Sequence, residues 1–170
     1  YSEISKIISL EEKIRKEVPG IAIRTTLMVG FPGETEEQFN ELISFVKEMQ
    51  FERLGVFTYS HEENTAAFSL KDDVLQSVKD QRAEELMSVQ REISLNNNRK
   101  YIGKTLKVLI DKKSGGYFEG RTEFDSPEVD NTVLIPAGGK YLRQGSFTNV
   151  EIKKTQEYDL YGDVVYEQVS

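Results

Sequence analysis

The sequence of 170 residues contains no cysteine, no tryptophan and a single histidine. Without thiols these residues can form no disulfide, no thiolate-bound metal centre and no cysteine nucleophile. One imidazole also leaves little basis for a zinc site, which usually takes two or three histidines when cysteine is absent. For the 170 residues themselves, these absences exclude several classes of metal and redox site.

Positive charge is also scarce, because 22 Lys and Arg stand against 29 Asp and Glu. The formal charge of −7 and the sequence pI near 4.9 argue against a protein that coats nucleic acid by charge alone. No apolar run approaches the roughly 20 residues of a membrane span, and no signal peptide is recognisable. We expect a cytoplasmic location and no membrane partner. The sequence starts at Tyr1 within a helical pattern, so we expect the natural protein to begin earlier.

The first segments predict a helix, a buried strand and a second helix. Apolar residues recur at three- and four-residue intervals over residues 3–18, which is the spacing of an amphipathic helix. Residues 21–30 are rich in β-branched side chains and almost continuously apolar, which is typical of a parallel strand buried on both faces. Thr35 and Gln38 have the spacing of a capping box, in which each side chain bonds a backbone N–H at the start of a helix.

A second apolar strand, residues 54–59, completes a βαβ unit. One such unit cannot cover both faces of its own strands. We therefore expect residues 1–72 to be one slice of a larger α/β barrel. Residues 73–100 predict a long charged helix with a narrow apolar seam, which links this part to the next.

The pattern changes near Tyr101 to short alternating strands separated by glycine-rich turns. We expect residues 101–170 to form a five-stranded antiparallel β-barrel of the OB-like kind. The overall class is thus α+β: a partial α/β barrel, a linking helix and a small β-barrel. The candidate barrel strands are 104–111, 117–123, 132–136, 147–154 and 158–167.

The segment from Val29 to Thr35, with the sequence VGFPGET, is the strongest candidate for a binding site. It follows the carboxyl end of a predicted parallel strand, where α/β sheets and barrels bind ligands. Its glycines allow backbone groups to approach a ligand closely. The alternative is an ordinary turn between a strand and a well-capped helix.

Residues Thr25 to Phe39 resemble the signature of the methylthiotransferases, a branch of the radical S-adenosylmethionine enzymes. Phe51 to Ser60 and Gln90 to Ser94 match the same family, and Gly103 to Leu109 resembles the opening of a TRAM domain, the C-terminal β-barrel of these enzymes. These matches occur in the family's order and together extend over essentially the whole chain. The resemblance implies the last strands of a radical domain followed by a TRAM domain.

Two branches of the family compete, one that modifies an adenosine of tRNA (the MiaB type) and one that modifies an aspartate of ribosomal protein twelve (the RimO type). Residues 61–67, 120–130 and 157–162 resemble the second branch. From Gly103 onward the chain has 9 basic and 11 acidic residues, a net charge of −2. An acidic barrel suits a basic ribosomal protein better than it suits tRNA.

The resemblance implies S-adenosylmethionine and two [4Fe–4S] clusters in the full-length enzyme. Clusters require thiolates, so this chain alone is expected to hold neither cluster and to be inactive. For the cofactor we expect backbone contacts from Val29 and Gly30 and packing from Phe31. Arg24 is either a further ligand residue or an arginine paired with a neighbouring carboxylate. We assign no catalytic or metal-binding residue, and we expect His61 to lie in a solvated loop.

The expected full-length activity is attachment of a methylthio group to the β-carbon of an aspartate in the ribosomal protein, after hydrogen abstraction by a 5′-deoxyadenosyl radical. The TRAM barrel would dock that protein. Two alternatives remain open: the tRNA-modifying branch, and a binding module without chemistry. Six barrel aromatics could form a stacking surface but fit core or rim positions better: Tyr117, Phe118, Phe124, Tyr141, Tyr158 and Tyr161.

Overall fold

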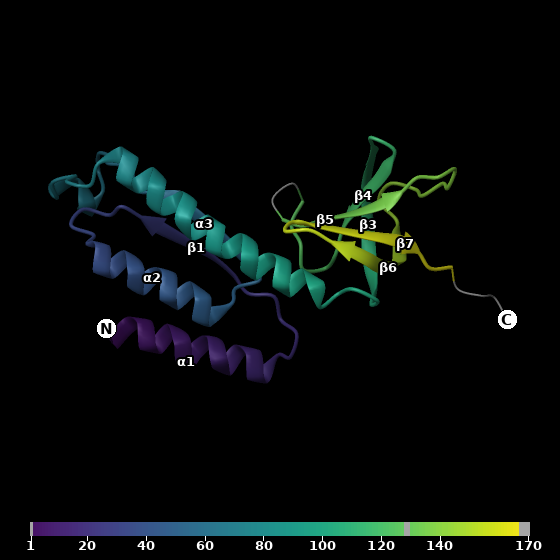
Figure 1. Ribbon diagram of the computed structural model, residues 1–170, viewed down its shortest axis with the longest axis horizontal. Coiled ribbons are helices and arrows are strands. Elements are labelled where there is room, and N and C mark those ends of the chain that lie inside the picture. The colour runs from purple at the N-terminus through teal and green to yellow at the C-terminus, as the bar shows by residue number, and fades with distance from the viewer. Residues whose placement is uncertain (1, 128–129, 167–170) are drawn as a thin grey trace. The chain divides into compact units, whose positions relative to one another are not determined.

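The structure, a computed structural model, describes residues 2–127 and 130–166, with side chains from Ser5 onward in those ranges. Tyr1, Glu128, Val129 and Glu167, which belong to predicted segments, lie outside the described residues. The chain divides into two compact units, Tyr1–Ile93 and Ser94–Ser170 (Figure 1). No helix in the described part of the chain is both long and apolar enough to span a membrane.

The first unit contains the predicted βαβ arrangement. Strands β1 (Arg24–Val29) and β2 (Arg53–Thr58) pair in parallel, and α2 (Glu36–Met49) connects them. Thr35 and Gln38 form the predicted capping box in both directions. The remaining elements are α1 (Ser2–Glu17), the 3₁₀ helix η1 (Ala66–Ser69) and α3 (Gln76–Arg99), which continues past Ile93 into the second unit.

The core of this unit lies on one face of the two strands. Val29 and Leu54 pack there with buried side chains of α2 and α3, including Phe39 and Leu86, and Figure 1 shows these helices beside β1. Side chains alternate along β1, because successive residues point to opposite faces. The prediction of a strand buried on both faces is therefore wrong for this chain: Met28, at 53% exposed, lies on the other face, which no described element covers.

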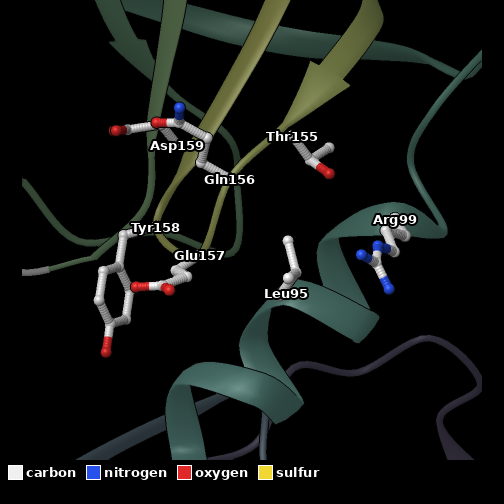
Figure 2. A pocket seen from close by; sticks show the side chains of 7 residues that line it. All are labelled: Leu95, Arg99, Thr155, Gln156, Glu157, Tyr158 and Asp159. Carbon is white, nitrogen blue, oxygen red and sulfur yellow. The ribbon is translucent and has the colours of Figure 1, made fainter. Parts of the chain in front are cut away.

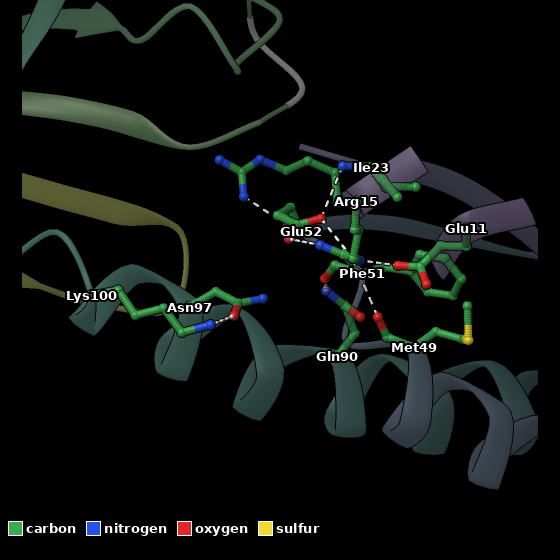
Figure 3. A network of polar contacts seen from close by, with 10 residues as sticks. Glu11, Arg15, Ile23, Met49, Phe51, Glu52, Gln90, Asn97 and Lys100 are labelled. Atoms are coloured by element: carbon green, nitrogen blue, oxygen red, sulfur yellow. Dashed lines mark hydrogen bonds and ion pairs between the residues drawn. The ribbon is translucent and has the colours of Figure 1, made fainter. Parts of the chain in front are cut away.

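A polar network fixes the segments that enter the two strands (Figure 3). Arg15 of α1 donates from Nη1 to Glu52 Oε1 at 2.7 Å, and Glu52 Oε2 accepts the backbone N–H of Ile23 at 2.9 Å. The hydrogen bond with Glu52 raises the pKa of Arg15, so the guanidinium stays charged. Gln90 of α3 donates to the Phe51 carbonyl at 3.0 Å. These bonds hold the amino ends of β1 and β2 together.

The second unit is a closed barrel of five strands in the order β3-β4-β5-β7-β6. Its strands are β3 (Thr105–Ser114), β4 (Tyr117–Arg121), β5 (Thr132–Pro136), β6 (Phe147–Thr155) and β7 (Asp159–Val164). The predicted five-stranded barrel is confirmed, but the purely antiparallel arrangement is wrong. β5 and β7 pair in parallel because β6 lies between them in sequence and reverses the chain before β7 begins.

Two glycines allow neighbouring barrel strands to approach closely. A Cβ on Gly120 in β4 would lie 2.5 Å from the carbonyl oxygen of Leu109 in β3. A Cβ on Gly162 in β7 would lie 2.5 Å from the carbonyl oxygen of Glu151 in β6. Each contact occurs in a strand pair that contains a register shift. The β3–β4 and β6–β7 hairpins are therefore built alike, with one side-chain-free position each.

The end of α3 is fixed to the barrel by a buried amide. Asn98 is fully buried, and its Nδ2 donates to the carbonyls of Gln156 and Glu157 at 3.1 and 3.0 Å. Its Oδ1 accepts a hydrogen bond from Asn131 at 2.8 Å. A residue with poor helix propensity is thus used for its hydrogen bonds to the turn between β6 and β7.

Candidate functional site

The carboxyl ends of β1 and β2 meet at one edge of the first unit. The N–H of Tyr59, directly after β2, donates to the carbonyl of Val29, the last residue of β1, at 2.9 Å. Gly30 and Phe31 follow at this edge. Arg24 is the first residue of β1, so it lies at the opposite end, about 16 Å away along the strand. The structure therefore groups three of the four predicted cofactor residues and separates the fourth.

The turn after β1 is held by a nearly buried ion pair. The N–H of Gly30 donates to Glu34 Oε1 at 3.0 Å, and Arg82 of α3 donates from Nη1 to the same oxygen at 2.7 Å. The side chains of Arg82 and Glu34 are only 8% and 12% exposed. Arg82 also bonds the Glu34 carbonyl, and its Nη2 reaches Glu36 at 3.2 Å. The guanidinium thus fastens the turn and the first residue of α2 to α3.

A buried lysine fills the space next to the same turn. Lys79 of α3 is 2% exposed, and its Nζ bonds Asp72 at 2.7 Å and the Tyr59 carbonyl at 3.3 Å. A Cβ on Gly30 would lie 2.3 Å from Lys79 Cγ, and Gly30 has a φ of +75°. The turn therefore requires glycine at this position for both its conformation and its contact.

Aromatic rings continue from this turn along the edge. Phe31 contacts Tyr59 edge-to-face, with ring centroids 5.3 Å apart. The hydroxyl of Tyr59 lies 3.2 Å from His61 Nδ1, and His61 stacks on Phe68 of η1 at 4.7 Å. Tyr59 is buried, whereas Phe31 and Phe68 are 42% and 44% exposed. The edge thus presents a row of rings anchored on one buried tyrosine.

The predicted cofactor contacts differ in what they leave open to a ligand. The Gly30 N–H is already bonded to Glu34, and Lys79 occupies the space beside its Cα. The Val29 side chain is fully buried in the core. Phe31, at 42% exposed, is accessible to a ligand. Among the described residues, no group of three His, Asp or Glu is placed to hold a metal ion.

Sequence reasoning missed Lys79 and Arg82, the two cations that α3 places at this edge. Their spacing contained a signal, because they continue at three- and four-residue intervals the line formed by Leu86, Val89 and Ile93. The described helix buries both cations, as it does these apolar neighbours in whole or in part. Charged residues on the buried side of a helix need partners, and here the partners lie in the turn after β1, at the residue after β2 and in the segment before α3.

In the second unit, a surface hollow of about 560 Å³ lies beside the turn between β6 and β7 (Figure 2). It is lined by Leu95, Arg99, Thr155, Gln156, Glu157, Tyr158 and Asp159. Burial, and secondarily the nearby Glu119 carboxylate, raise the pKa of Asp159. Burial also raises the pKa of Tyr161, with smaller contributions from Asp159 and Tyr117. The hollow is thus lined by the carboxylates of Glu157 and Asp159 together with Tyr158 and one cation, Arg99.

Replacing Asp159 with asparagine is expected to stabilise the barrel at pH 7. The folded state raises the pKa of this acid, so its contribution to stability is highest at low pH and falls as pH rises through the folded pKa. Asparagine removes that loss, and the advantage should vanish below about pH 3, where unfolded Asp is also protonated. Thermal unfolding of the wild-type and Asp159→Asn proteins between pH 3 and 7 measures this difference in stability. Asp163→Asn on the same strand is the control. A pH-independent difference would contradict this cause.

The six aromatic residues considered for a stacking surface differ in how deeply they are buried. Phe118 belongs to the barrel core, as expected. Tyr117, Tyr141 and Tyr158 are exposed at 37%, 85% and 40%, so they lie outside the core. Tyr117 contacts Tyr161 edge-to-face at 6.4 Å. The barrel therefore presents scattered tyrosines and one pair on its outer surface.

Comparison with known proteins identifies the domain family of the second unit and relatives of nearly the whole chain. Residues 102–165 match the family model of the TRAM domain. Nearly the whole chain is similar to proteins named ribosomal protein uS12 methylthiotransferase RimO. It is 56% identical over 158 residues to that of Christiangramia forsetii (93% of this chain, 35% of that protein) and 54% identical over 160 residues to that of Cytophaga hutchinsonii (94% and 37%). The protein of Petrotoga mobilis is 51% identical over 166 residues (97% and 38%). The chain spans little more than a third of the length of these relatives.

Proposed function

We propose that this chain, which belongs to the family of the uS12 methylthiotransferases, is the C-terminal part of an enzyme that attaches a methylthio group to the β-carbon of an aspartate in a small-subunit ribosomal protein. The observation that carries the proposal is identity of more than 50% over both units with the three relatives reported above, which have this name. The activity would take place in the cytosol, where the ribosomal protein is made.

The first unit would supply one edge of the cofactor site. S-adenosylmethionine and two iron–sulfur clusters would supply the radical and sulfur chemistry, and the cluster thiolates would come from other parts of the enzyme, since this chain has no cysteine. Phe31 would pack against the adenosyl group. Glu34, Arg82 and Lys79 would keep the turn that carries Phe31 in one conformation. Pre-organisation of this kind favours binding because less freedom is lost when the ligand arrives.

The second unit would dock the protein substrate. The net charge of −2 from Gly103 onward, which is the barrel without the end of α3, favours a basic protein over a polyanionic RNA. A surface that binds tRNA would gain affinity from an excess of lysine and arginine.

Incubation of the full-length enzyme with S-adenosylmethionine and a reductant, and with either purified uS12 or tRNA, tests this function. We expect mass spectrometry to find one methylthio group on one aspartate-containing peptide of uS12, and no change in tRNA nucleosides. A modified tRNA adenosine with unmodified uS12 would support the tRNA branch instead. No modification of either, together with retained uS12 binding, would support a binding module without chemistry.

A further inference from the structure

The loop between β2 and η1 is exposed to solvent and makes several hydrogen bonds within itself. Ser60 Oγ donates to Glu62 Oε1 at 2.6 Å, and Thr65 Oγ1 donates to the Glu62 carbonyl at 2.9 Å. The N–H of Phe68 closes a turn onto the Thr65 carbonyl at 3.1 Å. The loop thus has a defined conformation without being part of the core, which is common for segments that bind other molecules.

Two rings on this loop are stacked in solvent. His61 and Phe68 lie 4.7 Å apart with planes inclined by 29°, and Phe68 is 44% exposed. His61 contacts the buried Tyr59, which in turn contacts Phe31, so the stack is anchored on the edge that carries the proposed cofactor residues. Neither ring belongs to the core of the unit.

All charged side chains of the loop are acidic. Between Ser60 and Leu70 there are two glutamates and no lysine or arginine. Glu62 and Glu63 are both exposed, next in sequence to His61 of the ring stack. Aromatic faces and carboxylates together are the surface that binds lysine and arginine side chains, through cation–π contacts and charge-assisted hydrogen bonds. The same carboxylates would repel a phosphate backbone.

We propose that residues 60–70 bind a basic segment of the substrate protein, with a lysine or arginine side chain across the rings of His61 and Phe68 and its charge paired with Glu62 and Glu63. The inference rests on the proposed function, because the loop begins where β2 ends, at the edge assigned to the cofactor. A basic segment held there would lie beside the reacting aspartate, so these residues would select the substrate by the charges that flank its target.

The test reverses the loop charges in the full-length enzyme with Glu62→Lys and Glu63→Lys together. We expect KM for uS12 to rise about tenfold, because two favourable charge pairs become repulsive, while kcat stays within about twofold. Phe68→Ala should raise KM less and leave kcat unchanged. The matched control is Glu12→Lys, at an exposed position on α1, which should leave both constants unchanged.

Charge exchange separates recognition from a folding defect. A uS12 variant whose basic residues near the target are replaced by glutamate should be a poor substrate for the wild-type enzyme and should regain affinity for the charge-reversed enzyme. Calorimetry with a synthetic peptide rich in lysine and arginine measures the same contact without turnover. Loss of peptide binding only in the loop variants would support the inference, even if uS12 were not modified and the proposed function failed. Unchanged KM and unchanged peptide affinity in the charge-reversed enzyme would overturn it.

Discussion

Replacing Gly30 with alanine is expected to lower the free energy of unfolding of the first unit by about 3 kcal/mol. Two effects add at this position. Alanine at a φ of +75° has an unfavourable backbone conformation, and its Cβ would lie 2.3 Å from Cγ of the buried Lys79. Lys79 cannot withdraw easily, because its Nζ bonds Asp72 and the Tyr59 carbonyl. The loss is measured by urea unfolding, with hydrogen exchange reporting the unfolding of each unit separately. The urea midpoint of the barrel should not change.

Gly33 offers a matched control three residues further along the same turn. It has a φ of +79°, but nothing lies within 4 Å of the Cβ it would carry. Gly33→Ala should therefore cost only the backbone part, about 1 kcal/mol. Combining Gly30→Ala with Lys79→Ala should cost less than the sum of the two single changes, because the shortened side chain removes the clash. Equal losses for Gly30→Ala and Gly33→Ala would show that Lys79 does not crowd the turn.

The same substitution also tests the cofactor proposal. In the full-length enzyme, displacement of Lys79 would move the turn that carries Phe31, so Gly30→Ala should weaken S-adenosylmethionine binding in calorimetry, whereas Gly33→Ala should weaken it less. Unchanged affinity for the Gly30 variant would place the cofactor away from this turn.

The elements that could be predicted from sequence are those set by local chemistry. The Thr35 and Gln38 capping box depends on residues three positions apart, and the structure contains it. The number of barrel strands follows from the alternation of apolar and polar residues and from the turn residues between the strands. The parallel pairing of β5 with β7 could not be read in the same way, because it depends on where β6 lies in the closed sheet.

The candidate site was predictable only in its glycine-rich turn. Gly30 and Phe31 stand out because of the turn and of the family resemblance, whereas Lys79 and Arg82 lie about 50 residues further along in a helix rich in charge. Their role depends on long-range contacts with Glu34 and Tyr59 and on the contact of Lys79 with Asp72, none of which helical periodicity contains. A charged residue in line with the apolar seam of a helix is the one local sign of such a contact.

Breaking the Arg82–Glu34 pair is expected to lower the free energy of unfolding of the first unit by as much as Gly30→Ala does, or by more. Arg82→Leu would leave the Glu34 carboxylate, 12% exposed, without its cation, at a cost of about 3 to 5 kcal/mol. Arg82→Lys keeps the charge, but an ammonium cannot replace the planar fork that bonds Glu34 and Glu36 together, so an intermediate loss is expected.

Exposed charges on the same unit serve as the comparison. Lys13 of α1 lies 3.8 Å from Glu17, and both side chains are more than 60% exposed, so Lys13→Leu should change stability by no more than about 0.5 kcal/mol. If the loss in Arg82→Leu arises from the uncompensated carboxylate, adding Glu34→Leu should recover part of it, because two apolar groups replace a pair and no charge stays unpaired. Recovery also separates this cause from lost packing, since the double variant keeps the Arg82→Leu cavity. A double variant as unstable as the sum of its single changes would show that Arg82 acts instead through its other contacts, with the Glu34 carbonyl, Glu36 and the Phe39 ring.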